Sequence, residues 1–72
     1  MAKQKSLNDF SVFHEDLAVA EDSGGFFHLL QSGKPAYSER YAVVEYFQNG
    51  IAWVKEKSGR WKRISRDGAE VR

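Results

Sequence analysis

The feature that most restricts the fold of this chain is an internal repeat of about 30 residues. Segment 13–20 aligns with segment 47–54 at an offset of 34, with a phenylalanine, an aliphatic residue and an alanine at matching positions. Segment 23–33 aligns with segment 58–68 at an offset of 35, with Ser-Gly at its start and a glycine at its end. The additional residue falls where we expect a hairpin turn, and insertions cost least in turns. Two similar sequence units predict two similar supersecondary structures.

Turn signals divide each unit into short stretches. Asn49-Gly50 is the strongest of them, because both residue types tolerate a positive φ. Further turns are expected at 23–25, 32–33, 58–59 and 67–68. The strands expected between these turns are 17–21, 26–31, 40–47, 51–57, 60–65 and 69–72. The pattern therefore predicts an all-β fold of tandem β-hairpin repeats, a small meander of five or six antiparallel strands.

The repeat also predicts the domain organisation. Residues 7–72 are expected to form a single domain made of unit 7–37 and unit 38–72, preceded by a flexible tail at 1–6. Segment 7–16 allows two interpretations. Its apolar residues at 7, 10, 13 and 17 have helical spacing, which predicts an N-terminal helical turn, whereas the repeat predicts an edge strand.

The expected hydrophobic core follows from the apolar positions that the two units share. Within strand 51–57, residues Ile51 and Trp53 should lie on one face and residues Ala52 and Val54 on the other, because successive side chains alternate. The predicted core consists of Phe13, Leu17, Ala18, Val19, Phe26, Leu29, Val44, Phe47, Ile51, Ala52, Val54, Trp61 and Ile64.

The second unit resembles the WG repeat, a bacterial family of β-repeats. The residues that carry the resemblance are Tyr41, Phe47-Gln48-Asn49-Gly50-Ile51-Ala52, Val54, Gly59-Arg60-Trp61, Ile64 and Asp67-Gly68. In the first unit Phe26 stands in place of the tryptophan and Asp16 in place of Gly50. The resemblance implies stacked β-hairpin units that bind a protein or a ligand. It implies no catalytic residue.

Charge is distributed unevenly between the units. Residues 7–37 carry five acidic side chains and one lysine, whereas residues 50–72 carry seven basic and three acidic side chains. Such an asymmetry bears on association and not on fold. The chain has no cysteine, no apolar run of membrane-spanning length and no secretory signal, so we expect a cytoplasmic protein without a membrane role.

Candidates for chemistry are few. His14 and His28 are the only histidines, too few for a metal site without converging acidic ligands, and we expect them to be partly exposed structural residues. The serines lie in or beside turns, and Gly24-Gly25 is not followed by a helix that could bind phosphate. The sequence therefore predicts no catalytic residue, no metal and no cofactor, and the chain is not expected to be an enzyme.

The basic hairpin of the second unit is the predicted binding surface. It is formed by Trp53, Lys55, Lys57, Arg60, Lys62 and Arg63. A protein partner, or an accessory role within a longer chain, is the leading interpretation. The first alternative is nucleic acid, because aromatic side chains can stack on nucleobases and the basic side chains beside them can neutralise phosphates. The acidic first unit, however, would repel a long polyanion. The second is self-association, because two repeat units leave an apolar face and a strand edge to be covered.

Overall fold

Short strands separated by turns make up the regular structure of residues 13–72, the part of the chain that the computed structural model describes. The strands are β1 (Leu17–Asp22), β2 (Gly25–Leu30), β3 (Val43–Val44), β4 (Ile51–Lys55), β5 (Trp61–Ser65) and β6 (Glu70–Val71). No helix occurs in this range, and therefore none that could cross a bilayer. The prediction of an all-β fold of five or six strands is confirmed.

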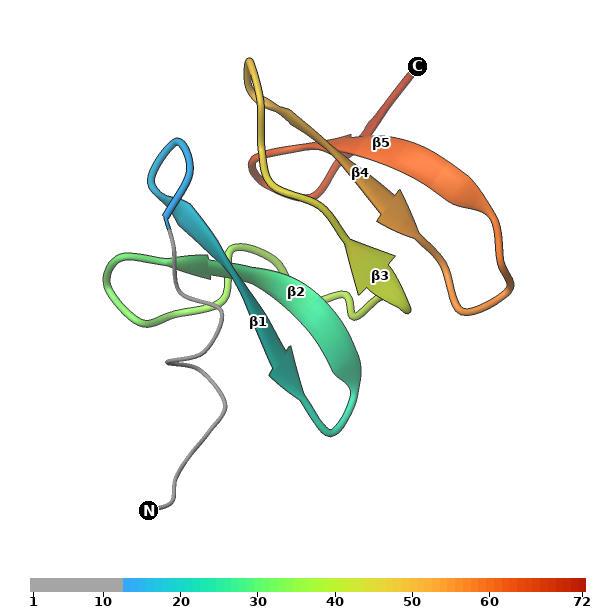
Figure 1. The fold of residues 1–72 in the computed structure, drawn as a ribbon, viewed down its shortest axis with the longest axis horizontal. Coiled ribbons are helices and arrows are strands. Elements are labelled where there is room, and N and C mark those ends of the chain that lie inside the picture. Colours follow the sequence, from blue (N-terminus) through green and yellow to red (C-terminus); the bar gives the residue numbers. More distant parts are fainter. Residues whose placement is uncertain (1–12) are drawn as a thin grey trace.

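The strands form two antiparallel sheets. Strands β1 and β2 make a two-stranded sheet, and the other four strands make a sheet in the order β3-β4-β5-β6. Figure 1 shows the β1–β2 and β4–β5 hairpins side by side, with β3 between them. Phe26 joins the sheets, because its N–H and C=O exchange hydrogen bonds of 2.8 and 2.9 Å with Tyr41.

The two hairpins have the same strand register, as the repeat predicts. Every pair in β4–β5 has a counterpart in β1–β2, at an offset of 34 in the first strand and 35 in the second. The corresponding pairs are Leu17–Leu30 and Ile51–Ser65, Ala18–Leu29 and Ala52–Ile64, Val19–His28 and Trp53–Arg63, Ala20–Phe27 and Val54–Lys62, and Glu21–Phe26 and Lys55–Trp61. The additional residue of the second unit therefore lies in the hairpin loop, where the alignment predicted it.

The turn before each hairpin is also repeated. Asn49 and Gly50 have φ values of 55° and 80°, the left-handed conformation expected for this dipeptide. Glu15 and Asp16 occupy the corresponding positions with φ values of 54° and 69°. The Glu15 carboxylate accepts hydrogen bonds from the Asn49 N–H (2.5 Å) and the Gly50 N–H (2.8 Å), so the two turns are in direct contact.

The main core lies between the units. It contains Leu17 and Ala20 of β1, Phe27 of β2, Tyr37 at the end of the first unit, and residues of the second unit from Tyr41 onward. Among the predicted core residues, those found buried are Leu17, Ala18, Val44, Phe47, Ala52, Val54 and Ile64, and those found partly buried are Val19, Phe26, Leu29 and Ile51. The sequence did not predict the burial of Ala20, Phe27, His28, Tyr37 and Tyr41.

Two predicted core residues are exposed. Trp61 is 44% exposed because it points to the face of β5 opposite Ile64, and that face is not covered within the described chain. Phe13 is 40% exposed, whereas its counterpart Phe47 is 1% exposed because it packs between the units against His28. Sequence similarity between repeat positions thus did not imply equal burial.

The strand expected over 40–47 is reduced to β3. The segment divides its backbone hydrogen bonds between the two sheets: Tyr41 pairs with Phe26 in β2, whereas Val43 and Val44 pair with β4. This change of partner explains why the strand is short. The expected tail at 1–6 and residues 7–12 of the ambiguous segment lie outside the described residues, and Glu15 and Asp16 form a turn.

Candidate functional site

One face of the four-stranded sheet carries most of the exposed apolar side chains of the second unit. Partners in an antiparallel pair point to the same face, so the strand register defines its members. We call this surface the outer face; it consists of Val43, Ile51, Trp53, Lys55, Trp61, Arg63, Ser65 and Val71. The opposite face, with Ala52, Val54 and Ile64, is buried in the core.

Aromatic and cationic side chains alternate at the centre of the outer face. Trp53 pairs with Arg63, and in the next row Lys55 pairs with Trp61. The two tryptophans are 47% and 44% exposed. The Arg63 guanidinium lies 5.7 Å from the centroid of a Trp53 ring, within the range of a cation–π contact. The four side chains form a surface that combines apolar area with two positive charges.

Only three of the six predicted site residues lie on this face, namely Trp53, Lys55 and Arg63. Lys62 points to the opposite side of β5, where it forms an ion pair with Glu56 at 3.0 Å. This hydrogen bond raises the pKa of Lys62 and lowers the pKa of Glu56. Arg60, in the β4–β5 loop, pairs with Glu56 and, at 2.7 Å, with Glu70. Lys62 and Arg60 thus have partners within the chain.

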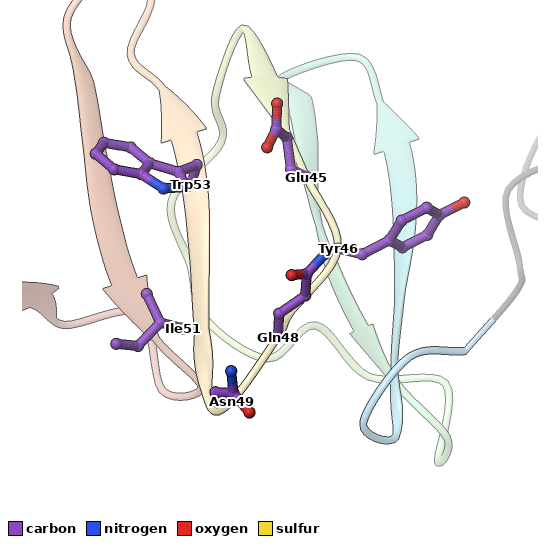
Figure 2. Close-up of a pocket in the computed structure, with 6 residues that line it drawn as sticks. All are labelled: Glu45, Tyr46, Gln48, Asn49, Ile51 and Trp53. Atoms are coloured by element: carbon purple, nitrogen blue, oxygen red, sulfur yellow. The ribbon is translucent and has the colours of Figure 1, made fainter.

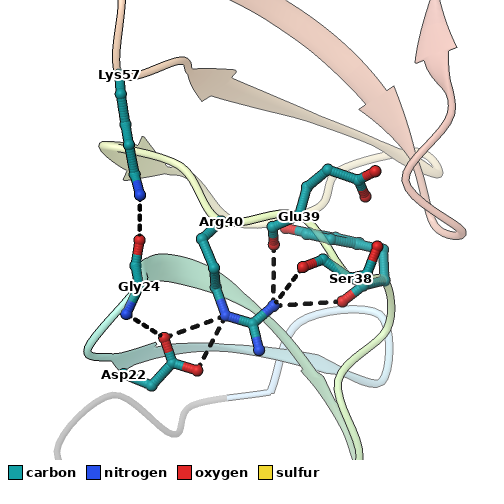
Figure 3. A network of polar contacts seen from close by, with 7 residues as sticks. Asp22, Gly24, Ser38, Glu39, Arg40 and Lys57 are labelled. Carbon is teal, nitrogen blue, oxygen red and sulfur yellow. Dashed lines mark hydrogen bonds and ion pairs between the residues drawn. The ribbon is translucent and has the colours of Figure 1, made fainter.

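Lys57 joins the two units and is not part of the outer face. Its ammonium group donates a hydrogen bond to the Gly24 carbonyl in the β1–β2 turn (Figure 3). In the same network Arg40 Nε donates to both oxygens of Asp22, at 3.0 and 3.1 Å, and its guanidinium lies 3.9 Å from the Phe27 ring centroid. The hydrogen bond from the Gly24 N–H, with Arg40, lowers the pKa of Asp22. These polar contacts hold one unit against the other.

A pocket of about 200 Å³ opens beside Trp53, between β4 and the chain that precedes it. It is lined by Glu45, Tyr46, Gln48, Asn49, Ile51 and Trp53 (Figure 2). The Glu45 N–H donates to the Trp53 carbonyl, so Glu45 lies across from Trp53 on the side of β4 opposite Arg63. Figure 2 shows the Tyr46 ring pointing away from the other side chains, and it stacks on His14 at 4.1 Å. The pocket extends the outer face at one end.

His28 is fully buried, and the prediction of partial exposure is wrong. Its Nε2 lies 2.8 Å from the Glu45 carbonyl oxygen, which can only accept, so Nε2 carries the proton. In the neutral ring Nδ1 then accepts from the Tyr37 hydroxyl at 2.6 Å. Burial lowers the pKa of His28, which favours this neutral form. Both contacts come from the chain that follows β2, Tyr37 at the end of the first unit and Glu45 in the second, and alternation within β2 alone could not reveal them.

No family model, curated protein or solved structure matches this chain. The residues themselves therefore carry the functional argument. Within residues 13–72, no three His, Cys, Asp or Glu side chains lie close enough together to hold a metal ion. The exposed Trp53 and Trp61, the cations beside them and the adjoining pocket are the features that a ligand could use.

Proposed function

We propose that this chain is a non-enzymatic binding module of the WG-repeat type, and that it binds a protein partner through its outer face. The observation that carries the proposal is the exposure of Trp53 and Trp61 on one face of the sheet, beside Lys55 and Arg63. Tryptophan and arginine are enriched among the residues that dominate protein–protein binding energy. An exposed pair of tryptophans on a rigid sheet fits this role.

Comparison of the two units supports a protein as the ligand. The outer-face residues Trp53, Trp61 and Arg63 correspond to Val19, Phe26 and His28 of the first unit. In the first unit this face is in contact with polypeptide, because the ring of His28 contacts Tyr37, Phe47 and the Glu45 carbonyl. The same position in the fold is therefore a protein contact in one unit and open in the other.

Single-stranded nucleic acid is a second candidate, and the structure provides a specific observation in its favour. Trp61, which was predicted to lie in the core where it could not stack bases, is exposed, and so is Trp53 of the predicted binding surface. Base stacking on an aromatic side chain contributes roughly 1–3 kcal/mol per base. Against this candidate, only Lys55 and Arg63 are cations of the central outer face, while Arg60 and Lys62 are held by acidic residues.

Photo-crosslinking in the host cell tests the proposal. A photoreactive amino acid replaces Val43 or Val71 at the margins of the outer face, and Lys34, exposed in the first unit, serves as the control position. We expect one and the same protein to be crosslinked from positions 43 and 71, and not from position 34. The adduct should resist nuclease and disappear in the Trp53→Ser/Trp61→Ser background.

Two results would contradict the proposal. A nuclease-sensitive adduct, together with salt-dependent binding of oligo(dT), would replace the protein with nucleic acid as the ligand. Adducts that do not depend on the tryptophans would show that the outer face is not the binding surface. Far-UV circular dichroism of each variant excludes unfolding as the cause of a lost adduct.

A further inference from the structure

The first unit shows how the outer face of the second unit can be occupied. Since the two hairpins share one register, the burial and contacts of a residue in β1–β2 can be compared with those of the corresponding residue in β4–β5, and the first unit serves as a template for the second. Leu17 is 1% exposed and His28 is fully buried. Their counterparts Ile51 and Arg63 are only partly buried. The difference marks the area that an additional polypeptide would cover.

A segment with aromatic side chains occupies this area in the first unit. Segment 37–47 contains β3 and lies between the two hairpins. Tyr37 contributes its hydroxyl to His28 at 2.6 Å, and the Phe47 ring packs edge-on against His28 at a centroid distance of 4.5 Å. The template is thus a segment that bends at Tyr37, Ser38 and Ala42, pairs with β2 through Tyr41 and directs aromatic side chains at the sheet.

Two substitutions between the units change the polar chemistry of the face. His28, which is buried and neutral in the first unit, corresponds to Arg63, and Glu21 corresponds to Lys55. Within residues 13–72 neither Lys55 nor Arg63 has an ion-pair partner. A segment that lies on the second face therefore needs carboxylates where segment 37–47 offers a hydroxyl, because a guanidinium binds carboxylates with charge-assisted hydrogen bonds.

The pocket beside Trp53 has the size for one side chain. Its volume of about 200 Å³ is below that of ordinary small-molecule sites, which are roughly 300–1,000 Å³. Ile51 and Trp53 supply its apolar wall. An aromatic side chain seated there would cover Ile51, as the corresponding Leu17 is covered in the first unit.

We infer that the outer face binds an acidic segment of another protein, with its carboxylates at Lys55 and Arg63 and an aromatic side chain in the pocket beside Trp53. This inference rests on the proposed function and specifies the chemistry of the partner. A second copy of this chain fits less well. In a second copy, the residues that correspond to segment 37–47 at the repeat offset of 34 are 3–13. They carry Lys3, Lys5 and the single acidic residue Asp9, so they would bring net positive charge to Lys55 and Arg63.

Peptides based on the template test the inference with the full chain. The acidic probe has the sequence of residues 37–47 with Arg40→Glu, and the matched control has glutamine at positions 39, 40 and 45. Binding is followed by tryptophan fluorescence and by the amide and indole resonances of the labelled protein. We expect the acidic probe to bind, to weaken with salt and to shift Trp53, Lys55, Trp61 and Arg63, and the neutral control to bind at least about tenfold more weakly.

Charge reversal in the protein provides the second arm. Lys55→Glu and Arg63→Glu should each weaken binding of the acidic probe about tenfold, the value of one hydrogen bond to a charged group. Lys34→Glu changes the net charge equally at an exposed site of the first unit and should weaken binding less than about twofold.

The outcomes separate the inference from the proposed function. If the probe shifts His28 or Tyr37 instead of the outer face, or if Lys55→Glu and Lys34→Glu behave alike, the inference is wrong. If sedimentation shows that the protein alone associates and that Trp53→Ser abolishes this association, the occupant is a second copy and the inference is also wrong. If crosslinking from positions 43 and 71 captures a partner that the acidic probe does not displace, the proposed function stands and only the acidic chemistry fails.

Discussion

The hydrogen bond between Tyr37 and His28 provides a sharp test of what stabilises the buried His28 in the core. Tyr37→Phe removes only the hydroxyl and keeps the ring in its contacts with His28 (5.7 Å) and Tyr41 (5.9 Å). It leaves Nδ1 of the fully buried His28 without its donor at 2.6 Å. A buried polar atom that loses its partner costs roughly 1–3 kcal/mol.

The chain contains a matched control. The hydroxyl of Tyr41 is also buried, but it has no hydrogen-bond partner in the described part of the chain. Tyr41→Phe therefore removes a hydroxyl whose desolvation is not compensated, and stability should stay within about 0.5 kcal/mol of the wild type or rise. The two variants make the same chemical change in adjoining rings, so their difference isolates the hydrogen bond to His28.

Thermal denaturation measured by tryptophan fluorescence and circular dichroism tests the pair. For a domain of this size a loss of 1 kcal/mol lowers Tm by about 4–8 °C, so Tyr37→Phe should melt at least about 2 °C below Tyr41→Phe. Equal stabilities for the two variants would refute the reasoning, because they would show that the hydrogen bond at His28 contributes nothing. A Tyr41→Phe variant that is the less stable of the two would refute it as well.

Two further predictions concern the same region. Burial lowers the pKa of His28 in the folded state, so the unfolded state takes up the proton first; stability is complete above about pH 6.5 and falls as the pH drops below it. Urea midpoints at pH 7.5 and 5.5 should show this loss of stability, and His28→Gln should reduce it. Gly68→Ala would place a Cβ 2.7 Å from Tyr37 Cβ, whereas Gly59→Ala meets no atom within 4 Å. Both glycines have a similar positive φ (91° and 99°), so each alanine costs about 1 kcal/mol of backbone strain, and thermal melts should show Gly68→Ala roughly 1–3 kcal/mol less stable than Gly59→Ala.

Which cations of the basic stretch lie free on the outer face could not be predicted from the sequence. Lys57, Arg60 and Lys62 look equivalent to Lys55 and Arg63 in a basic stretch of chain. In the fold, Lys57 reaches Gly24 of the other unit, and Arg60 and Lys62 meet acidic side chains. Which acidic or carbonyl group a long lysine or arginine side chain binds depends on the groups that the fold brings near it, and the local sequence contains little information about those groups.

By itself the sequence determined the all-β class, the turns and the common register of the two hairpins. Its information is local: Asn49-Gly50 prefers left-handed backbone, and the one-residue change of offset can be absorbed only in a loop. Only the tertiary structure decided which sheet face is covered. Alternation assigns Trp61 and Ile64 to opposite faces, but it does not say which face meets the other unit. Packing of Phe47 and Tyr37 against His28 made that choice in the first unit, and it left Trp53 and Trp61 exposed in the second.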